Sequence, residues 1–92
     1  MPRFMIEITH EDNIEACEYA KRAFYRTGSH FMTNAEFGCQ DEVHKAWLIV
    51  EVDSKDDAER IIPPDFRNNA QIVTLEKMDP SDMEDMIEHH TN

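Results

Sequence analysis

HKAWLIVEV, residues 44–52, is the most apolar run of this 92-residue chain, and the interpretation of the rest starts from it. Every residue from 46 to 50 is apolar, which is typical of a strand in the interior of a sheet. A second run, RFMIEIT at residues 3–9, alternates apolar and polar side chains with the period of a half-buried strand. We therefore expect two central strands that share one buried face, formed by Phe4, Ile6, Ile8, Leu48, Val50 and Val52.

Two helices are expected on that buried face. Residues 12–27 carry apolar side chains at helical spacing, and either Asp12 or Asn13 can cap the start of the helix. A second helix is expected to begin at Ser54, which stands three residues before an acidic side chain as in a capping box. The prolines at 63–64 end this helix, because proline disfavours helical geometry in the residue before it.

Residues 30–37 and 70–77 are expected to form the two outer strands, and Asp79-Pro80 begins a short C-terminal helix over 79–90. The resulting order within 3–77 is βαββαβ, which predicts a single α+β domain with the ferredoxin-like fold. Right-handed crossovers then give the strand order 4-1-3-2, with all neighbours antiparallel and both helices on one face.

The expected hairpin of strands 30–37 and 44–52 turns at Gln40-Asp41, so paired residues sum to 81. The pairs are then Glu36–Lys45, Asn34–Trp47, Met32–Ile49 and His30–Glu51. A slip of two residues would change these partners but leave each side chain on the same face.

The face without helices is expected to mix apolar and acidic side chains: Met5, Glu7, Met32, Trp47, Ile49, Glu51 and Ile72. Soluble monomers seldom expose a contiguous apolar patch beyond about 300–600 Å². We therefore expect a second copy of the chain to cover this face, which makes the protein a homodimer.

This pattern resembles the dimeric α/β-barrel superfamily, in which two such sheets pack into a barrel. The phrase IIPPDFRNNAQIVTLE, residues 61–76, is similar in style to muconolactone isomerases and related small members. The resemblance covers residues 3–77 and is one of architecture, so it implies a dimer more than any particular activity.

The charge balance limits the partners. Nine Lys and Arg against twenty Asp and Glu give a formal net charge of −11, which repels nucleic acid and anionic membrane surfaces.

Cys17 is expected to be a small buried hydrophobe and Cys39 a turn residue. Neither lies in a CxxC pair, so a reducing cytoplasm is the predicted compartment. The histidine and cysteine spacing matches no zinc template, and the expected pairing separates His30 from His44, so neither a metal nor a cofactor is predicted.

Glu7 and a His30–Glu51 pair are the candidate catalytic groups. Burial of a carboxylate by a second subunit would raise its pKa towards neutrality, which suits a general acid or base. Trp47, Asn34 and Arg67 are the candidate ligand-binding residues. The alternative for the acidic groups is an ion-paired or wet interface, and for Trp47 an anchor of the dimer.

Two functions follow from these candidates. In the first, a homodimer binds a small organic molecule and moves a proton on it, as an isomerase or lyase would. In the second, the chain is a non-catalytic sensing or assembly module whose sheet face only mediates dimerisation. A cavity beside Glu7 would favour the first, and an ion-paired face would favour the second.

Overall fold

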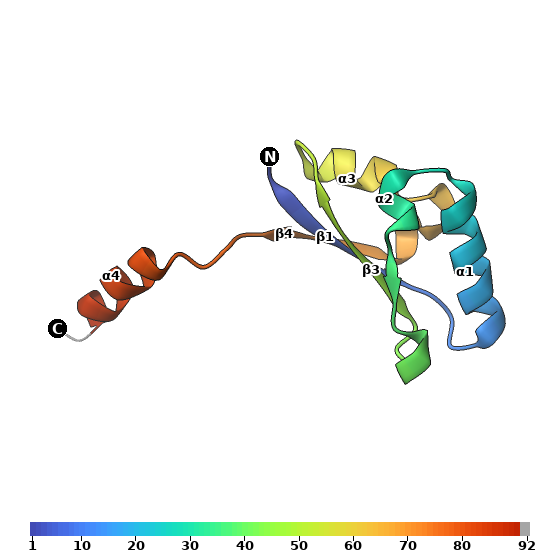
Figure 1. The fold of residues 1–92 in the computed structure, drawn as a ribbon, viewed down its shortest axis with the longest axis horizontal. Coiled ribbons are helices and arrows are strands. Elements are labelled where there is room, and N and C mark those ends of the chain that lie inside the picture. The colour runs from blue at the N-terminus through green and yellow to red at the C-terminus, as the bar shows by residue number, and fades with distance from the viewer. Residues whose placement is uncertain (91–92) are drawn as a thin grey trace.

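The computed structural model describes residues 1–90 and is drawn as a ribbon in Figure 1. Its strands are β1 (Arg3–Thr9), β2 (Glu36–Phe37), β3 (Lys45–Glu51) and β4 (Ala70–Leu75). Its α-helices are α1 (Ile14–Arg26), α2 (His30–Thr33), α3 (Lys55–Ile61) and α4 (Pro80–His90), and two 3-10 turns are η1 (Cys39–Asp41) and η2 (Pro64–Asn69).

The four strands form one antiparallel sheet in the order β2-β3-β1-β4, which read from the other edge is β4-β1-β3-β2. The expected α+β class and the antiparallel four-stranded sheet are thereby confirmed. β1 and β3 pair along their whole length, from Arg3 opposite Glu51 to Thr9 opposite Lys45, and form the centre of the sheet.

One face of the sheet is covered by helices and holds the core. Alternate residues of β1 and β3 are buried there, as their sequence period predicts: Phe4, Ile6, Ile8, Ala46, Leu48 and Val50. α1 contributes Phe24, and α3 contributes Ala58. Trp47 and Leu48 therefore lie on opposite sides of β3, with Leu48 in the core, as expected.

The helix starts follow the sequence signals. Asn13 rather than Asp12 caps α1, because its Oδ1 accepts a hydrogen bond of 2.7 Å from the Ala16 amide. Ser54 caps α3 by accepting from the Asp57 amide at 3.2 Å.

The expected strand over 30–37 is wrong for its first half, which forms the short helix α2. Ser29 caps this helix by accepting from the Met32 amide, and the Thr33 hydroxyl and Asn34 amide donate to backbone carbonyls of the same turn. Such local hydrogen bonds compete with strand pairing. Burial decides the outcome, because the helical turn places Met32 in the core with 1 % of its surface exposed, not on the open face.

The hairpin register also differs from the expected one by two residues, because Glu36 lies opposite Trp47 and Phe37 opposite Ala46. The cause is the turn itself, in which η1 and a left-handed Glu42 with φ of 62° occupy the connection. Gly38 is required there, because a Cβ atom at this position would lie 2.9 Å from the Trp47 ring.

A further correction concerns β4. Ile72 pairs with Ile6 and packs against the core, so it does not lie on the open face. Val73, opposite Met5, takes that place.

The last helix, α4, stands apart from the body of the protein at the end of an extended segment that follows β4 (Figure 1). At the start of this helix, Asp79 Oδ1 accepts a hydrogen bond of 2.9 Å from the backbone amide of Ser81. Met83, Met86 and Ile87 are exposed on it. No helix in the described part of the chain has the length and apolar character that a bilayer crossing requires.

Candidate functional sites

Glu7, Lys45 and Trp47 form a polar group on the face of the sheet opposite α1 and α3. Glu7 lies opposite Trp47 in the β1–β3 ladder, and Lys45 is two residues before Trp47, so all three side chains project from the same face. Glu7 Oε1 accepts a hydrogen bond of 3.2 Å from the Trp47 indole and lies 3.1 Å from the Lys45 ammonium. The carboxylate is therefore already partnered within one chain.

This pairing reverses the expected direction of the Glu7 pKa. Hydrogen bonds from Lys45 and from Trp47 lower the pKa of this carboxyl below its ordinary value, and they outweigh the opposing effect of desolvation. A carboxyl that acts as a general base near neutral pH needs a raised pKa. The geometry of the single chain therefore favours a structural charge pair between Glu7 and Lys45 over a catalytic role for Glu7.

The other sequence-derived candidates are not brought together. His30 lies in α2 and Glu51 pairs with Arg3, so the expected His30–Glu51 pair is wrong. Asn34 ends α2 and donates to the His30 carbonyl, and it does not lie opposite Trp47.

Arg67 lies in η2, whose Phe66 packs against Phe24 on the helix-covered side of the sheet. Its Nε donates to the Ile62 carbonyl at 3.0 Å, which ties η2 to the end of α3. Arg67 is therefore on the other side of the sheet from the Glu7 group.

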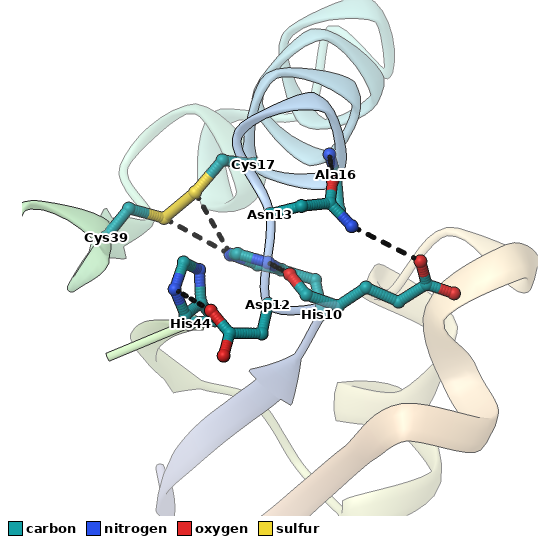
Figure 2. The surroundings of a disulfide bond; sticks show 8 residues. His10, Asp12, Asn13, Ala16, Cys17, Cys39 and His44 are labelled. Atoms are coloured by element: carbon teal, nitrogen blue, oxygen red, sulfur yellow. Dashed lines mark hydrogen bonds and ion pairs between the residues drawn. A yellow bond between two sulfur atoms is a disulfide. The ribbon is translucent and has the colours of Figure 1, made fainter. Parts of the chain in front are cut away.

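A second constellation, which the sequence analysis missed, lies at one end of the central strands and is drawn in Figure 2: His10, Cys17, Cys39 and His44. His10 directly follows β1 and His44 directly precedes β3, and the His10 amide donates to the His44 carbonyl at 3.0 Å. The two residues thus extend the β1–β3 ladder by one pair on the helix-covered side, where Ile8 and Ala46 precede them.

The two cysteines approach this pair from the helix side. Cys17 is in the first turns of α1 on its buried face, and Cys39 begins η1 in the β2–β3 connection. They are joined in a disulfide across a sequence separation of 22 residues. Cys17 is buried and Cys39 lies in the turn, as expected, but the interpretation of Cys17 as a simple hydrophobe is wrong, because the tertiary fold brings the helix and the turn together.

Both imidazoles are oriented by acceptors on their outer side. His44 Nε2 lies 2.7 Å from Asp12 Oδ1, and His10 Nδ1 lies 3.0 Å from the Glu11 carbonyl (Figure 2). Because a carboxylate and a carbonyl only accept, these nitrogens carry the hydrogens, and in the neutral form of each ring the lone pair is on the other, inward nitrogen.

The inward nitrogen of His10 faces sulfur, and that of His44 has no partner among the described residues. His10 Nε2 lies 3.6 Å from Cys17 Sγ and 3.3 Å from Cys39 Sγ, and His44 Nδ1 is buried without a hydrogen-bond partner among the described residues. A disulfide sulfur has no hydrogen to donate, so neither lone pair meets a donor there. A buried acceptor left in this state costs about 1–3 kcal/mol. Two thiolates and two imidazole nitrogens are a ligand set that tetrahedral metal ions bind, whereas the sequence had predicted none.

A surface groove of about 440 Å³ opens beside this cluster, and His10 lies in its wall. Its other lining residues include Glu11, Glu15 and Asp65, so the groove favours cations over anions. Glu7 is not among the residues that line it.

Compared with known proteins, the chain shows no significant match to a family model, a curated protein or a solved structure.

Proposed function

We propose that the chain is a self-associating assembly module, a homodimer formed through the open face of its sheet. The βαββαβ element order and the sheet order support a ferredoxin-like fold, and the open face supports pairing of two sheets as in dimeric α/β barrels. One observation carries the proposal: the central strand exposes Ile49 to 51 % and the edge strand exposes Val73 to 42 %, next to Met5 in the same layer. A second sheet is the simplest cover for such a face.

The charge of this face also supports a second copy as the occupant. The strand residues on it comprise two cations, Arg3 and Lys45, and three carboxylates, Glu7, Glu36 and Glu51, which leaves a net charge of −1. The whole chain carries −11, so this face holds little of the charge, and two copies that meet through it bring few unbalanced like charges together.

The C-terminal helix supports the same arrangement. Met83, Met86 and Ile87 expose 38 %, 52 % and 58 % of their surfaces on a helix that stands apart from its own domain (Figure 1). A helix with an apolar stripe gains most of its stability from packing, so α4 is suited to dock on the partner subunit.

A small-molecule site inside the dimer is the second candidate, and the Glu7–Lys45–Trp47 group favours it. Two facing sheets would enclose this polar group from each subunit within otherwise apolar walls, which is the usual composition of a ligand site. The lowered pKa of Glu7 fits orientation of a polar ligand better than proton transfer.

The test is sedimentation of the purified chain at micromolar concentration, where we expect twice the 10.8 kDa chain mass. Ile49→Glu should shift the chain towards monomer, because it places a charge in the centre of the interface. Ile14→Glu is the matched control, since Ile14 is 76 % exposed on α1, away from the face. A monomeric wild-type chain, or equal effects of the two substitutions, would contradict the proposal.

A further inference from the structure

We propose that the reduced chain binds one Zn²⁺ ion through His10 Nε2, Cys17 Sγ, Cys39 Sγ and His44 Nδ1. This site lies at the end of the central strands and is independent of the open sheet face, so it extends beyond the proposed dimer. Each of the four residues has one possible ligand atom within 4.8 Å of those of the other three.

The distances fit a tetrahedral ion. With Zn–S about 2.3 Å and Zn–N about 2.0–2.1 Å, a bound nitrogen and sulfur are about 3.6 Å apart. The structure has 3.6 Å from His10 Nε2 to Cys17 Sγ and 3.3 Å to Cys39 Sγ. The two sulfurs must separate, because thiolates that share a zinc ion are about 3.8 Å apart and are not bonded to each other.

The surroundings hold both imidazoles in the form that binds metal. Metal-bound histidines almost always donate their other ring nitrogen to a carboxylate or a backbone carbonyl. Here Asp12 accepts from His44 at 2.7 Å and the Glu11 carbonyl lies 3.0 Å from His10 Nδ1, which leaves the inward nitrogens as ligands. The buried and unpartnered His44 Nδ1 is the independent sign of a missing partner.

Four protein ligands from four separate segments close the site, which is typical of structural rather than catalytic zinc. The ion would tie the β1 end, α1, η1 and the β3 start together, whereas the disulfide of the oxidised chain joins only α1 and η1. In a reducing compartment disulfides are rare, and paired cysteines there more often bind metal.

The metal ion and the disulfide cannot be present in this site at the same time, because the metal binds the two sulfurs as separate thiolates, whereas the disulfide joins them in an S–S bond. In the test, a water-soluble phosphine and one water convert the disulfide into two thiols and a phosphine oxide. Zn²⁺ then displaces the two thiol protons, and the neutral imidazoles lose none. Hydrogen peroxide, a two-electron oxidant that is itself reduced to water, would convert the two thiolates back to the disulfide and release the ion.

The experiment uses Co²⁺ as a spectroscopic probe for Zn²⁺ in the full chain, under nitrogen and after removal of excess reductant. We expect saturation at one ion per chain, the strong visible bands of tetrahedral Co²⁺, a thiolate-to-cobalt charge-transfer band, and displacement by Zn²⁺. The oxidised chain should show none of these features.

Three variants test the ligand assignment. Cys39→Ser should remove most of the charge-transfer intensity, and His44→Gln should abolish stoichiometric binding. Asp12→Asn should weaken the affinity for Zn²⁺ roughly 10- to 100-fold and keep the tetrahedral spectrum, because it acts only through His44. Since Asp12 is 90 % exposed in its side chain, this variant folds even if a core variant does not.

His30→Gln is the matched control, because His30 is exposed in α2 outside the cluster, and it should bind as the wild type does. A second control replaces His89 and His90 by Ala and should also bind normally. The proposal is overturned if the reduced wild-type chain binds no Co²⁺ stoichiometrically, if the bound ion is octahedral, or if either control loses the ion.

Discussion

Reduction of the Cys17–Cys39 disulfide in the absence of metal should strongly destabilise the chain. The cross-link spans 22 residues, and closing a loop of this length removes enough denatured-state entropy to stabilise the fold by about 3.4 kcal/mol. A small domain has a total free energy of unfolding of only about 5–15 kcal/mol. For a domain of this size, the loss corresponds to a fall in the melting temperature of roughly 13–27 °C.

The assay is thermal unfolding followed by circular dichroism, with a chelator present and with protein concentration held constant. Titration of thiols must show two per chain before the reduced sample is used. The double variant Cys17→Ala, Cys39→Ala is the control, and its melting temperature should not respond to reductant. Addition of Zn²⁺ to the reduced wild type should recover stability by about 4 kcal/mol at a free concentration 1,000 times Kd.

A fall of less than about 4 °C in fully reduced wild type, which is under about 1 kcal/mol, would refute the reasoning. A fall in the double variant as large as the one expected for the wild type would also refute it, because the effect would then not come from the cross-link.

Three further outcomes are expected. Lys45→Met should raise the pKa of Glu7, measured by NMR of its carboxyl carbon. Because the pKa of Glu7 is lowered in the folded wild type, the Glu7–Lys45 pair stabilises the fold above the unfolded-state pKa, and this stabilisation is lost as the pH falls through the folded-state pKa. The variant should therefore lose less stability in acid than the wild type does. Phe24→Ala should cost about 3–5 kcal/mol in denaturant unfolding, because this ring is 2 % exposed and contacts two other aromatic rings, and a cost under about 1 kcal/mol would contradict the core assignment. Glu42→Gly should stabilise by up to about 1 kcal/mol, because φ is 62° there, whereas Glu42→Ala should bring no gain.

Local patterns predicted the elements whose signals are strong. The period of two in residues 3–9 and the apolar run at 44–52 placed Trp47 and Leu48 on the correct faces, because alternation is a property of the strand backbone. The helix caps at Asn13 and Ser54 could be predicted for a similar reason, because a capping side chain accepts a hydrogen bond from a backbone amide only two or three residues away.

The segment 30–37 could not be assigned from local signals alone. Its polar side chains favour a helical turn and its length fits a strand, and the choice was made by the space that Met32 fills in the core. The turn at η1 and Glu42 set the register of the hairpin, and the expected His30–Glu51 pair was lost because His30 lies in α2.

The sequence by itself determined the faces of β1 and β3, the starts of α1 and α3 and the acidic charge, because each depends on neighbours along the chain. Only the tertiary structure decided that His10 and His44 stand opposite each other, because this depends on the β1–β3 register, which no local pattern specifies. The docking of α1 and η1 over that point then brought Cys17 and Cys39 together across 22 residues. A metal-ligand set assembled from four separate segments has no spacing signature, and so the fold had to reveal it.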